Sequence, residues 1–360
     1  MLLIIDKYVA KLFILFFGAG LLIFTTLFLA VDFLSFAARF SDAGFDALLK
    51  YYGYFTPSII YQMIPVASLL STVFTLSTLN KSNELVALFS SGMSLARVSA
   101  PMLVIVAGLS VFSFWLGDRV LPHFEQKKNY VYYVELKKKP GLYSTVNTDK
   151  IWYRSENILF NIQTLNPDDS TAQGMTLYYF NEAWDLVQLI TAKTVSMLEN
   201  VWVLKNGTVT LFVQDESFPL TKSFKEKQIS MNEDVADLKA SSRASTIMSL
   251  GELRRFIKKN KEAGLDTIRY EVDYHSKFGF AFASLVMALM GIPFSVSKQR
   301  SGGLFVNAGI CIALAFLYWA LYSSAITLGK HGVISPFFAA WVPNILSLSG
   351  SIYLLLRLNK

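Results

Sequence analysis

The chain has 360 residues, of which 53% are hydrophobic, 14% are aromatic and only 16% are charged. Soluble domains usually carry about 25% charged residues, so this composition excludes an ordinary soluble protein. The formal net charge of +7 is spread along the chain. A nucleic-acid-binding protein would gather such charge into one basic stripe, so no nucleic-acid partner is expected. The single cysteine, Cys311, cannot form an internal disulfide.

Six apolar runs predict six membrane-spanning helices. Most of them reach the roughly 20 residues that cross about 30 Å of hydrocarbon. Bilayers admit only helices or closed barrels, and these runs lack the alternation of barrel strands. The runs cover residues 12–38, 55–79, 102–116, 278–294, 304–328 and 337–356. Three runs therefore precede a long polar middle segment and three follow it.

Basic residues in the short loops predict the orientation, because Lys and Arg accumulate on the cytoplasmic side. If the N-terminus is cytoplasmic, that side holds Lys7, Lys11, Lys81, Arg97, Lys298, Arg300, Arg357 and Lys360. The opposite short loops hold only Arg39, Lys50 and Lys330. Both termini are therefore predicted to be cytoplasmic, and the middle segment lies on the other side of the membrane.

The middle segment, residues 118–268, predicts an all-β domain. It contains short β-branched or aromatic stretches with partial alternation, typical of strands in a sandwich or jelly roll. Asn206-Gly207 predicts a type I′ hairpin turn, because both central residues of that turn need positive φ. The domain separates two helical segments, residues 1–117 and 269–360.

A connecting helix is predicted near the end of this domain, over residues 250–263. Ser249 and Glu252 form a capping box at its start, and Gly264 ends it. The helix carries five basic residues. They are interpreted as a solvated face, with a face near anionic lipid headgroups or a partner as the alternative.

No catalytic chemistry is indicated. The chain has no phosphate-binding loop, so it is not expected to hydrolyse ATP, and no Cys/His cluster indicates a metal site. Glu271 and His275, four residues apart, are interpreted as an interfacial hydrogen-bonded pair. Asp32 lies within the first apolar run, where a carboxylate is unfavourable and usually faces a cavity or a partner.

A short helix over about residues 82–92 is predicted between the second and third runs. Ser82 is expected to cap it, Glu84 lies in its first turn and Gly92 ends it. Leu85, Leu88 and Phe89 are then predicted to form one apolar stripe. Two interpretations remain open: a helix lying on the membrane surface, or a coupling helix that inserts into a groove of a soluble motor subunit.

The sequence around this helix resembles the LptF/LptG permease family of lipopolysaccharide export. The resemblance lies in residues 84–88 (ELVAL), followed by residues 91–94 (SGMS) and Pro101, and the six-span layout around a β domain is similar. Val31-Asp32 and the stretch from Tyr51 to Pro65 resemble the LptG branch more than the LptF branch.

This resemblance implies an α-helical polytopic protein of the bacterial inner membrane, with six spans arranged 3+3 around a periplasmic β-jellyroll-like domain. It also implies a heterodimer with a paralogous permease, and a cytoplasmic dimer of ABC ATPase subunits that binds the ATP. No cofactor of the chain's own is implied. The periplasmic domain would pass lipopolysaccharide to proteins with similar jelly-roll domains.

Site residues follow from the resemblance. The ATPase-coupling residues would be Glu84, Leu85, Ala87, Leu88, Gly92 and Ser94. Arg39 fits the family's basic position for lipid A phosphates near the outer end of span one, whereas Asp32 stands where a base is expected. Spans one and five form the family's gate, which implies acyl-chain contacts at Phe28, Phe33, Phe36, Phe305 and Phe316. The alternative for each phenylalanine is ordinary core or lipid-facing packing.

The sequence therefore predicts the transmembrane subunit of an ATP-driven lipopolysaccharide extractor. Exposing one acyl chain of about a dozen carbons to water costs about 10 kcal/mol, so the β domain needs an apolar trough. Its inward residues are predicted to be Ile158, Phe160, Leu177, Val203 and Leu211, and its free edge to pair with the next domain. The alternatives are a membrane scaffold or assembly factor, which needs no trough, and an ion-coupled lipid transporter, which needs a titrating site such as Asp32.

Overall fold

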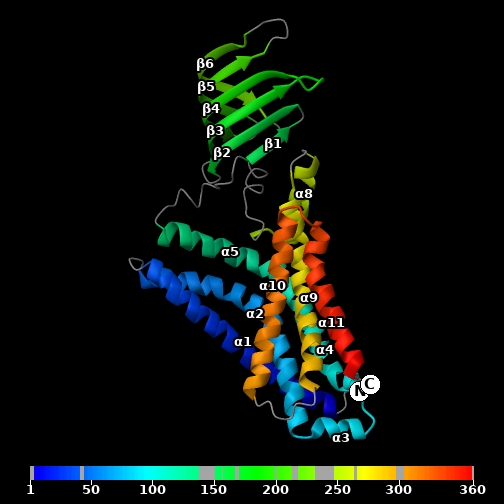
Figure 1. The fold of residues 1–360 in the computed structure, drawn as a ribbon. Coiled ribbons are helices and arrows are strands. Elements are labelled where there is room, and N and C mark those ends of the chain that lie inside the picture. The colour runs from blue at the N-terminus through cyan, green and yellow to red at the C-terminus, as the bar shows by residue number, and fades with distance from the viewer. Residues whose placement is uncertain are drawn as a thin grey trace. The chain divides into compact units, whose positions relative to one another are not determined.

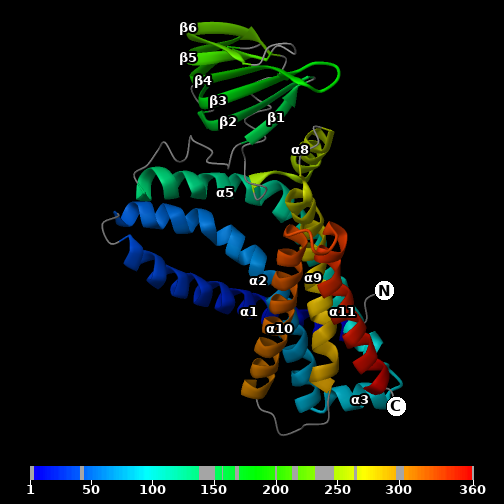
Figure 2. The same cartoon turned by 45° about the horizontal axis from the view of Figure 1, so that its top comes forward.

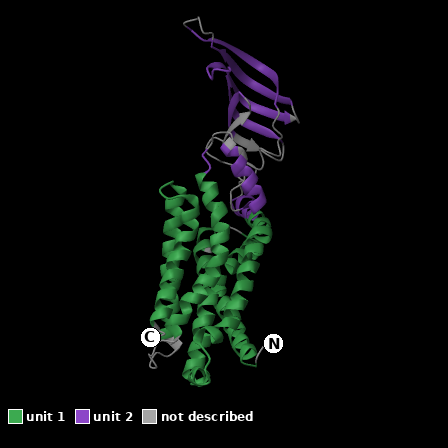
Figure 3. Cartoon of the chain, turned by 90° about the vertical axis from the view of Figure 1, so that its right-hand side faces the viewer, with its two compact units in different colours: residues 1–128, 268–360 green, residues 129–267 purple. Residues whose placement is uncertain are grey.

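The computed structural model describes residues 4–40, 44–137, 151–155, 157–166, 170–198, 201–212, 218–231, 247–262, 266–296 and 304–358. It divides into two compact units, one formed by residues 1–128 with 268–360 and the other by residues 129–267 (Figure 3). The first unit is helical and the second contains an antiparallel sheet. The predicted fold class, a polytopic helical protein with an inserted β domain, is confirmed.

Six helices are long and apolar enough to cross a membrane, as predicted. These helices are α1 (Ile4–Arg39), α2 (Phe45–Lys81), α4 (Leu95–Trp115), α9 (Ile268–Val296), α10 (Leu304–Lys330) and α11 (Pro336–Leu358) (Figure 1). Each helix extends beyond its apolar run, because polar side chains at a helix end do not interrupt the backbone hydrogen bonds.

The centre of the helical unit is formed by α2 and α9. In each of these two helices 72% of the most apolar 18-residue stretch is buried, compared with 17% of the corresponding stretch in α1. The two helices approach closely at Gly291, where an added Cβ would lie 3.0 Å from Val73 Cγ2 and 3.2 Å from the Leu69 carbonyl oxygen. Small residues of this kind let membrane helices pack at short range. Helix α1 therefore lies at the periphery of the helical unit, and α2 and α9 form its core.

The third span continues as one helical run to Leu136. After α4 it passes through a π-helical turn, η1 (Leu116–Val120), then α5 (Leu121–Tyr130) and a second π-helical turn, η2 (Val131–Leu136). Helical structure therefore crosses the predicted boundary at residues 117 and 118. α5 lies beside the first half of α2 in both views of the fold (Figures 1 and 2), where Ser58 Oγ donates to Glu125 Oε1 at 2.6 Å.

Six antiparallel strands form one sheet whose spatial order follows the chain. They are β1 (Ile151–Ser155), β2 (Ile158–Asn166), β3 (Thr171–Phe180), β4 (Leu186–Leu198), β5 (Val201–Leu211) and β6 (Leu220–Ser230). Figure 2 shows the strands side by side. One face carries a buried cluster that includes Phe160, Leu177 and Trp202, and Phe160 and Trp202 meet edge to face at 5.5 Å.

The predicted inward residues of the sheet are partly right. Phe160 and Leu177 are fully buried and Ile158 packs against their cluster. The predictions for Val203 and Leu211 are wrong, since Val203 is half-buried outside the cluster and Leu211 is 44% exposed. Trp202 and Leu204 supply the buried side chains of this strand instead. Alternate residues point to opposite faces, so Val203 points away from the face of Trp202 and Leu204. Leu211 shares the face of Val209 but is exposed at the end of the strand.

The hairpin turn predicted at Asn206-Gly207 is wrong, because β5 continues through both residues. Asn206 does adopt positive φ (54°), but it lies in a row across the sheet with Gly174 of β3, whose φ is 65°. At this row the buried positions shift by one residue, so that Ala172 and Met175 share a face. The left-handed residues therefore bend the strands within the sheet and do not reverse the chain.

Gly207 is required by this bend, because an added Cβ would lie 1.9 Å from the Thr191 carbonyl oxygen. We expect Gly207→Ala to lower the free energy of unfolding by about 2 kcal/mol, the range for overpacking a close contact. Tryptophan fluorescence during unfolding of the solubilised chain measures this change when every tryptophan other than Trp202 is replaced by phenylalanine in both variants. Gly251→Ala is the control, because nothing lies within 4 Å of its Cβ position. Equal unfolding midpoints for both variants would contradict the conclusion that the bend in β5 requires glycine at position 207.

The predicted capping box opens α8 (Leu250–Glu262). The Ser249 N–H donates to Glu252 Oε2 at 2.8 Å, and the Glu252 N–H donates to Ser249 Oγ at 3.4 Å. These reciprocal bonds satisfy backbone donors that have no partner within the helix. The predicted end of the helix, around residues 263 and 264, lies outside the described residues.

Candidate functional site

The predicted short helix forms as α3 (Glu84–Ser90). At its end Gly92 has a φ of 86°, the Gly92 N–H donates to the Phe89 carbonyl and the Met93 N–H donates to the Leu88 carbonyl. This pair of bonds is a Schellman motif, so the prediction that Gly92 ends the helix is confirmed. The predicted Ser82 cap is wrong. Ser82 Oγ donates to the Thr78 carbonyl at 3.0 Å and closes the preceding helix α2.

The two faces of α3 differ from the predicted single stripe. Leu85 is only 1% exposed and packs in a buried cluster with residues of α1, α2 and α4, and Leu88 packs against the same cluster. Phe89, predicted to share that stripe, is 38% exposed, and Val86 is 46% exposed. Ala87 is exposed as well. Leu85 therefore anchors the helix, while Val86, Ala87 and Phe89 form its outward face.

Polar contacts also hold α3 in place. The Tyr8 hydroxyl of α1 lies 3.4 Å from Glu84 Oε1 and donates to it. Ser94 lies beyond α3 and caps α4, where its Oγ accepts a hydrogen bond from the Arg97 N–H at 3.2 Å. Sequence reasoning missed Val86 and Tyr8 as neighbours of this site. The exposure of Val86 follows from its spacing of three residues from Phe89, which puts both on one helix face.

The C-terminal end of α1 and the first turns of α2 carry an aromatic cluster, which we define as Phe33, Phe36, Tyr51, Tyr52 and Phe55. Phe36 stacks on Tyr51 with ring centroids 4.5 Å apart, and Phe33 meets Tyr52 edge to face at 5.4 Å. Phe55 lies 5.8 Å from Tyr51. The structure therefore brings two of the five predicted phenylalanines together with three rings of α2.

Asp32 has a partner, as expected for a carboxylate in a membrane span. The Tyr52 hydroxyl donates to Asp32 Oδ2 at 2.8 Å, so the aromatic cluster itself supplies the hydrogen bond. Arg39 lies in the last turn of the same helix and is exposed. Phe28, one helical turn before Asp32, is 37% exposed.

Two lysines of α5 add positive charge beside this cluster, and sequence reasoning missed them. Lys128 Nζ lies 4.9 Å from the centre of the Phe55 ring, and Lys127 Nζ lies 5.7 Å from that of Tyr54. A cation over an aromatic face is attracted by the ring quadrupole. Lys128 also pairs with Glu125. The available signal was the position of these lysines in the polar stretch that follows the third apolar run.

The predicted contacts on α10 do not join the aromatic cluster among the described residues. Phe316 is 76% exposed on α10, and none of the described ring contacts connects it to Phe33 or Phe36. The side chain of Phe305 lies outside the described part of the chain. The structure thus places Phe316 on an outward face of its helix.

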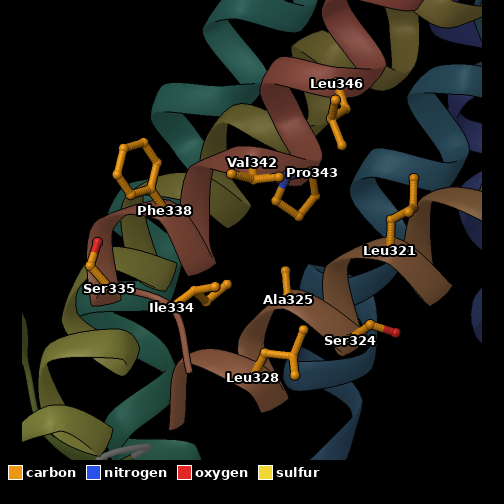
Figure 4. A pocket seen from close by; sticks show the side chains of 10 residues that line it. All are labelled: Leu321, Ser324, Ala325, Leu328, Ile334, Ser335, Phe338, Val342, Pro343 and Leu346. Carbon is orange, nitrogen blue, oxygen red and sulfur yellow. The ribbon is translucent and has the colours of Figure 1, made fainter. Parts of the chain in front are cut away.

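A groove of about 550 Å³ lies between α10 and α11. Figure 4 shows Leu321, Ala325 and Leu328 of α10 facing Phe338 and Pro343 of α11 across it. Its lining is apolar apart from the hydroxyl groups of two serines, and no titratable side chain lines it. The groove therefore has the character of a hydrocarbon-facing surface and offers no acid–base chemistry.

These features define a class of protein: a polytopic membrane protein with an extramembrane β unit and a short anchored helix that presents an apolar outward face. The profile of the family described as "Lipopolysaccharide export system permease LptF/LptG" matches residues 7–357, so the chain belongs to this family.

Two curated relatives show the same relationship. The chain is 24% identical over 358 residues to a Haemophilus influenzae protein named "Lipopolysaccharide export system permease protein LptG", with 95% of each chain covered. It is also 24% identical over 374 residues to the Escherichia coli K12 protein of the same name, with 98% of each chain covered. The resemblance to the family is confirmed, and both of these relatives carry the LptG name, in line with the predicted likeness to that branch. The chain is a lipopolysaccharide export permease.

Proposed function

We propose that this permease works in the bacterial inner membrane as one half of a heterodimer with a paralogous permease. Both termini are cytoplasmic and the β unit is periplasmic. A dimer of cytoplasmic ABC ATPase subunits binds and hydrolyses ATP, and the permease itself has no ATPase site and needs no cofactor. The β unit passes lipopolysaccharide to periplasmic proteins with similar jelly-roll domains.

The outward face of α3 is the observation that carries this proposal. Val86 and Phe89 are large apolar side chains exposed on a helix that Leu85 anchors to the helical unit. A fixed helix with exposed apolar residues suits insertion into a groove on a partner. Glu84, Ala87, Leu88, Gly92 and Ser94 complete the coupling segment by shaping the helix and its ends.

The aromatic cluster is proposed as the lipid-handling site. Phe33 and Phe36 offer apolar rings near the outer end of α1, and Phe28 and Phe316 add exposed rings for acyl chains. Arg39 is proposed to bind a lipid A phosphate, since a guanidinium offers a bidentate fork. Lys127 and Lys128 supply further positive charge, and Asp32 holds Tyr52 in place through its hydrogen bond.

The sheet is proposed to guide acyl chains over its apolar face. Tyr179, Val209 and Phe224 are partly buried at the margin of the sheet cluster, where an acyl chain finds apolar contacts without disrupting the fully buried core. Among the described strands β6 pairs with β5 alone, and it carries Lys222, Lys225 and Lys227 with a single Glu226. Lysines on an edge strand oppose indiscriminate strand pairing, so a strand that docks there should be acidic.

Purification of the permease with its associated subunits tests this function. Mass spectrometry of the complex should detect lipopolysaccharide, a second permease and an ATPase, and ATP should drive release of the lipid. An ion-coupled transporter would release lipid in response to an ion gradient without ATP. A scaffold would retain proteins but show no lipid release under either condition.

The proposed orientation makes a separate prediction. In a Cys311→Ala background, a cysteine at Ser301 should react with an impermeant thiol reagent only from the cytoplasmic side. A cysteine at Lys205, an exposed position of β5, should react only from the periplasmic side. The reason is that basic residues of short loops are retained in the cytoplasm. Labelling of intact and permeabilised cells measures both, and the reverse pattern would overturn the orientation.

A further inference from the structure

The start of α1 holds the start of α4 through a two-pronged ion pair. Arg97 Nη1 and Nη2 donate to Asp6 Oδ1 and Oδ2 at 2.8 and 2.9 Å, and Asp6 is only 6% exposed. Arg97 lies in the first turn of α4, where the helix dipole disfavours a cation. The bidentate contact with Asp6 offsets that unfavourable position and fixes the geometry of both helices.

The same end of α1 also holds α3. Leu85 of α3 packs in one buried cluster with Val9 and Phe13 of α1, and the Tyr8 hydroxyl donates to Glu84. The link between α3 and α4 is short. The Schellman motif fixes its first residues to the end of α3, and the Ser94 cap fixes its last residue to the start of α4. The starts of α1 and α4 and the whole of α3 therefore form one block.

The helix α1 is suited to move as a rod. It has 36 residues without a proline, so it is roughly 54 Å long at 1.5 Å per residue. α2, by contrast, contains Pro57 and Pro65. Only 17% of the most apolar stretch of α1 is buried, so its contacts are confined to one side, where α2 packs against it. Phe33 and Phe36 lie at the end of α1 that is far from Asp6.

We propose that Asp6 and Arg97 are positioning residues that couple α3 to α1. In this mechanism a docked ATPase displaces α3, and the short link carries the displacement to the start of α4. The ion pair then passes it to the start of α1, and the far end of α1 moves Phe33 and Phe36 against the lipid. The inference rests on the proposed function of α3 as the ATPase-docking helix. Neither residue contacts lipid or ATP.

Arg97→Lys tests the coupling in the assembled complex, reconstituted in lipid vesicles. Lysine keeps the charge but loses the two-pronged contact. We expect lipopolysaccharide released per ATP hydrolysed to fall at least about fivefold, because the start of α4 no longer moves α1 with it, while the ATPase rate and the yield of complex stay unchanged. Asp6→Asn combined with Arg97→Lys should be no worse than the more defective single variant, since the two residues act as a unit. Lys7→Gln, an exposed neighbour of Asp6, is the control and should match the wild type.

A second measurement does not depend on the lipid. Spin labels at Leu34 of α1 and at Val333, both exposed, should show a distance change on ATP binding in the wild-type complex and a clearly smaller one in Arg97→Lys. Unchanged release per ATP in Arg97→Lys, or a parallel loss of ATPase activity and complex, would overturn the inference. A wild-type complex whose labels move but which releases no lipopolysaccharide would instead refute the proposed function.

Discussion

Phe89→Asp is expected to abolish co-purification of the ATPase with the permease while leaving the permease in the membrane. Phe89 is 38% exposed on the outward face of α3, so the charge is tolerated in the free chain. Within a docked groove the same carboxylate would be buried without a partner, and an aromatic anchor would be lost. Truncation of such an anchor weakens an interface by about 2–4 kcal/mol, which is roughly 30-fold to 1,000-fold in the dissociation constant.

Affinity purification followed by quantification of the ATPase measures this effect. Lys81→Asp is the matched control, because it introduces the same carboxylate at an exposed position of α2 close to α3 and removes no apolar contact. Leu85→Asp should behave differently, since Leu85 is buried and its loss should reduce the amount of folded permease. Normal ATPase recovery with Phe89→Asp would remove the outward face of α3 from the docking site.

The six spans were predictable because the hydrocarbon core imposes a length and a composition that few other structures require. The ends of the spans were less predictable. The apolar run of the third span stops at residue 116, yet the helical run continues to Leu136, since helical hydrogen bonds do not depend on apolar side chains. Hydropathy therefore locates the membrane-embedded part of a helix but does not determine where the helix ends.

Local signals failed where the same backbone preference serves two structures. Asn206-Gly207 favours positive φ, which suits both a hairpin turn and a bend within a strand, and only the neighbouring strands decide between them. The prediction of which face of α3 is buried failed for a similar reason. In a helix of seven residues a small error in phase moves Phe89 from the buried side to the exposed side.

Long-range contacts were not predictable from spacing. Asp6 and Arg97 are 91 residues apart, and Tyr52 and Asp32 are 20 residues apart, so only the packing of α1 against α4 and α2 brings these pairs together. The sequence did indicate that Asp32 requires a partner, because an isolated carboxylate is unfavourable in hydrocarbon. It did not indicate that the partner is a hydroxyl of the aromatic cluster.

Arg39→Glu is expected to lower lipopolysaccharide binding about tenfold, and Arg39→Lys should lower it much less. Arg39 is exposed in the last turn of α1, close in sequence to Phe33 and Phe36. The lipid A phosphates are anionic, so glutamate repels them, whereas lysine keeps the attraction and loses only the bidentate geometry. A residue that merely marks the membrane boundary would show no such order between the two variants.

Photo-crosslinking to lipopolysaccharide from position 28 measures this difference without altering the aromatic cluster. Lys50→Glu is the matched control, because it makes the same change in net charge at an exposed position near the start of α2, where Lys50 pairs with the exposed Asp46 one turn away. Crosslinking should fall in Arg39→Glu and persist in Lys50→Glu. Equal crosslinking in the wild type and both variants would assign the phosphate contact to Lys127, Lys128 or another chain, and would leave Arg39 as an orientation signal only.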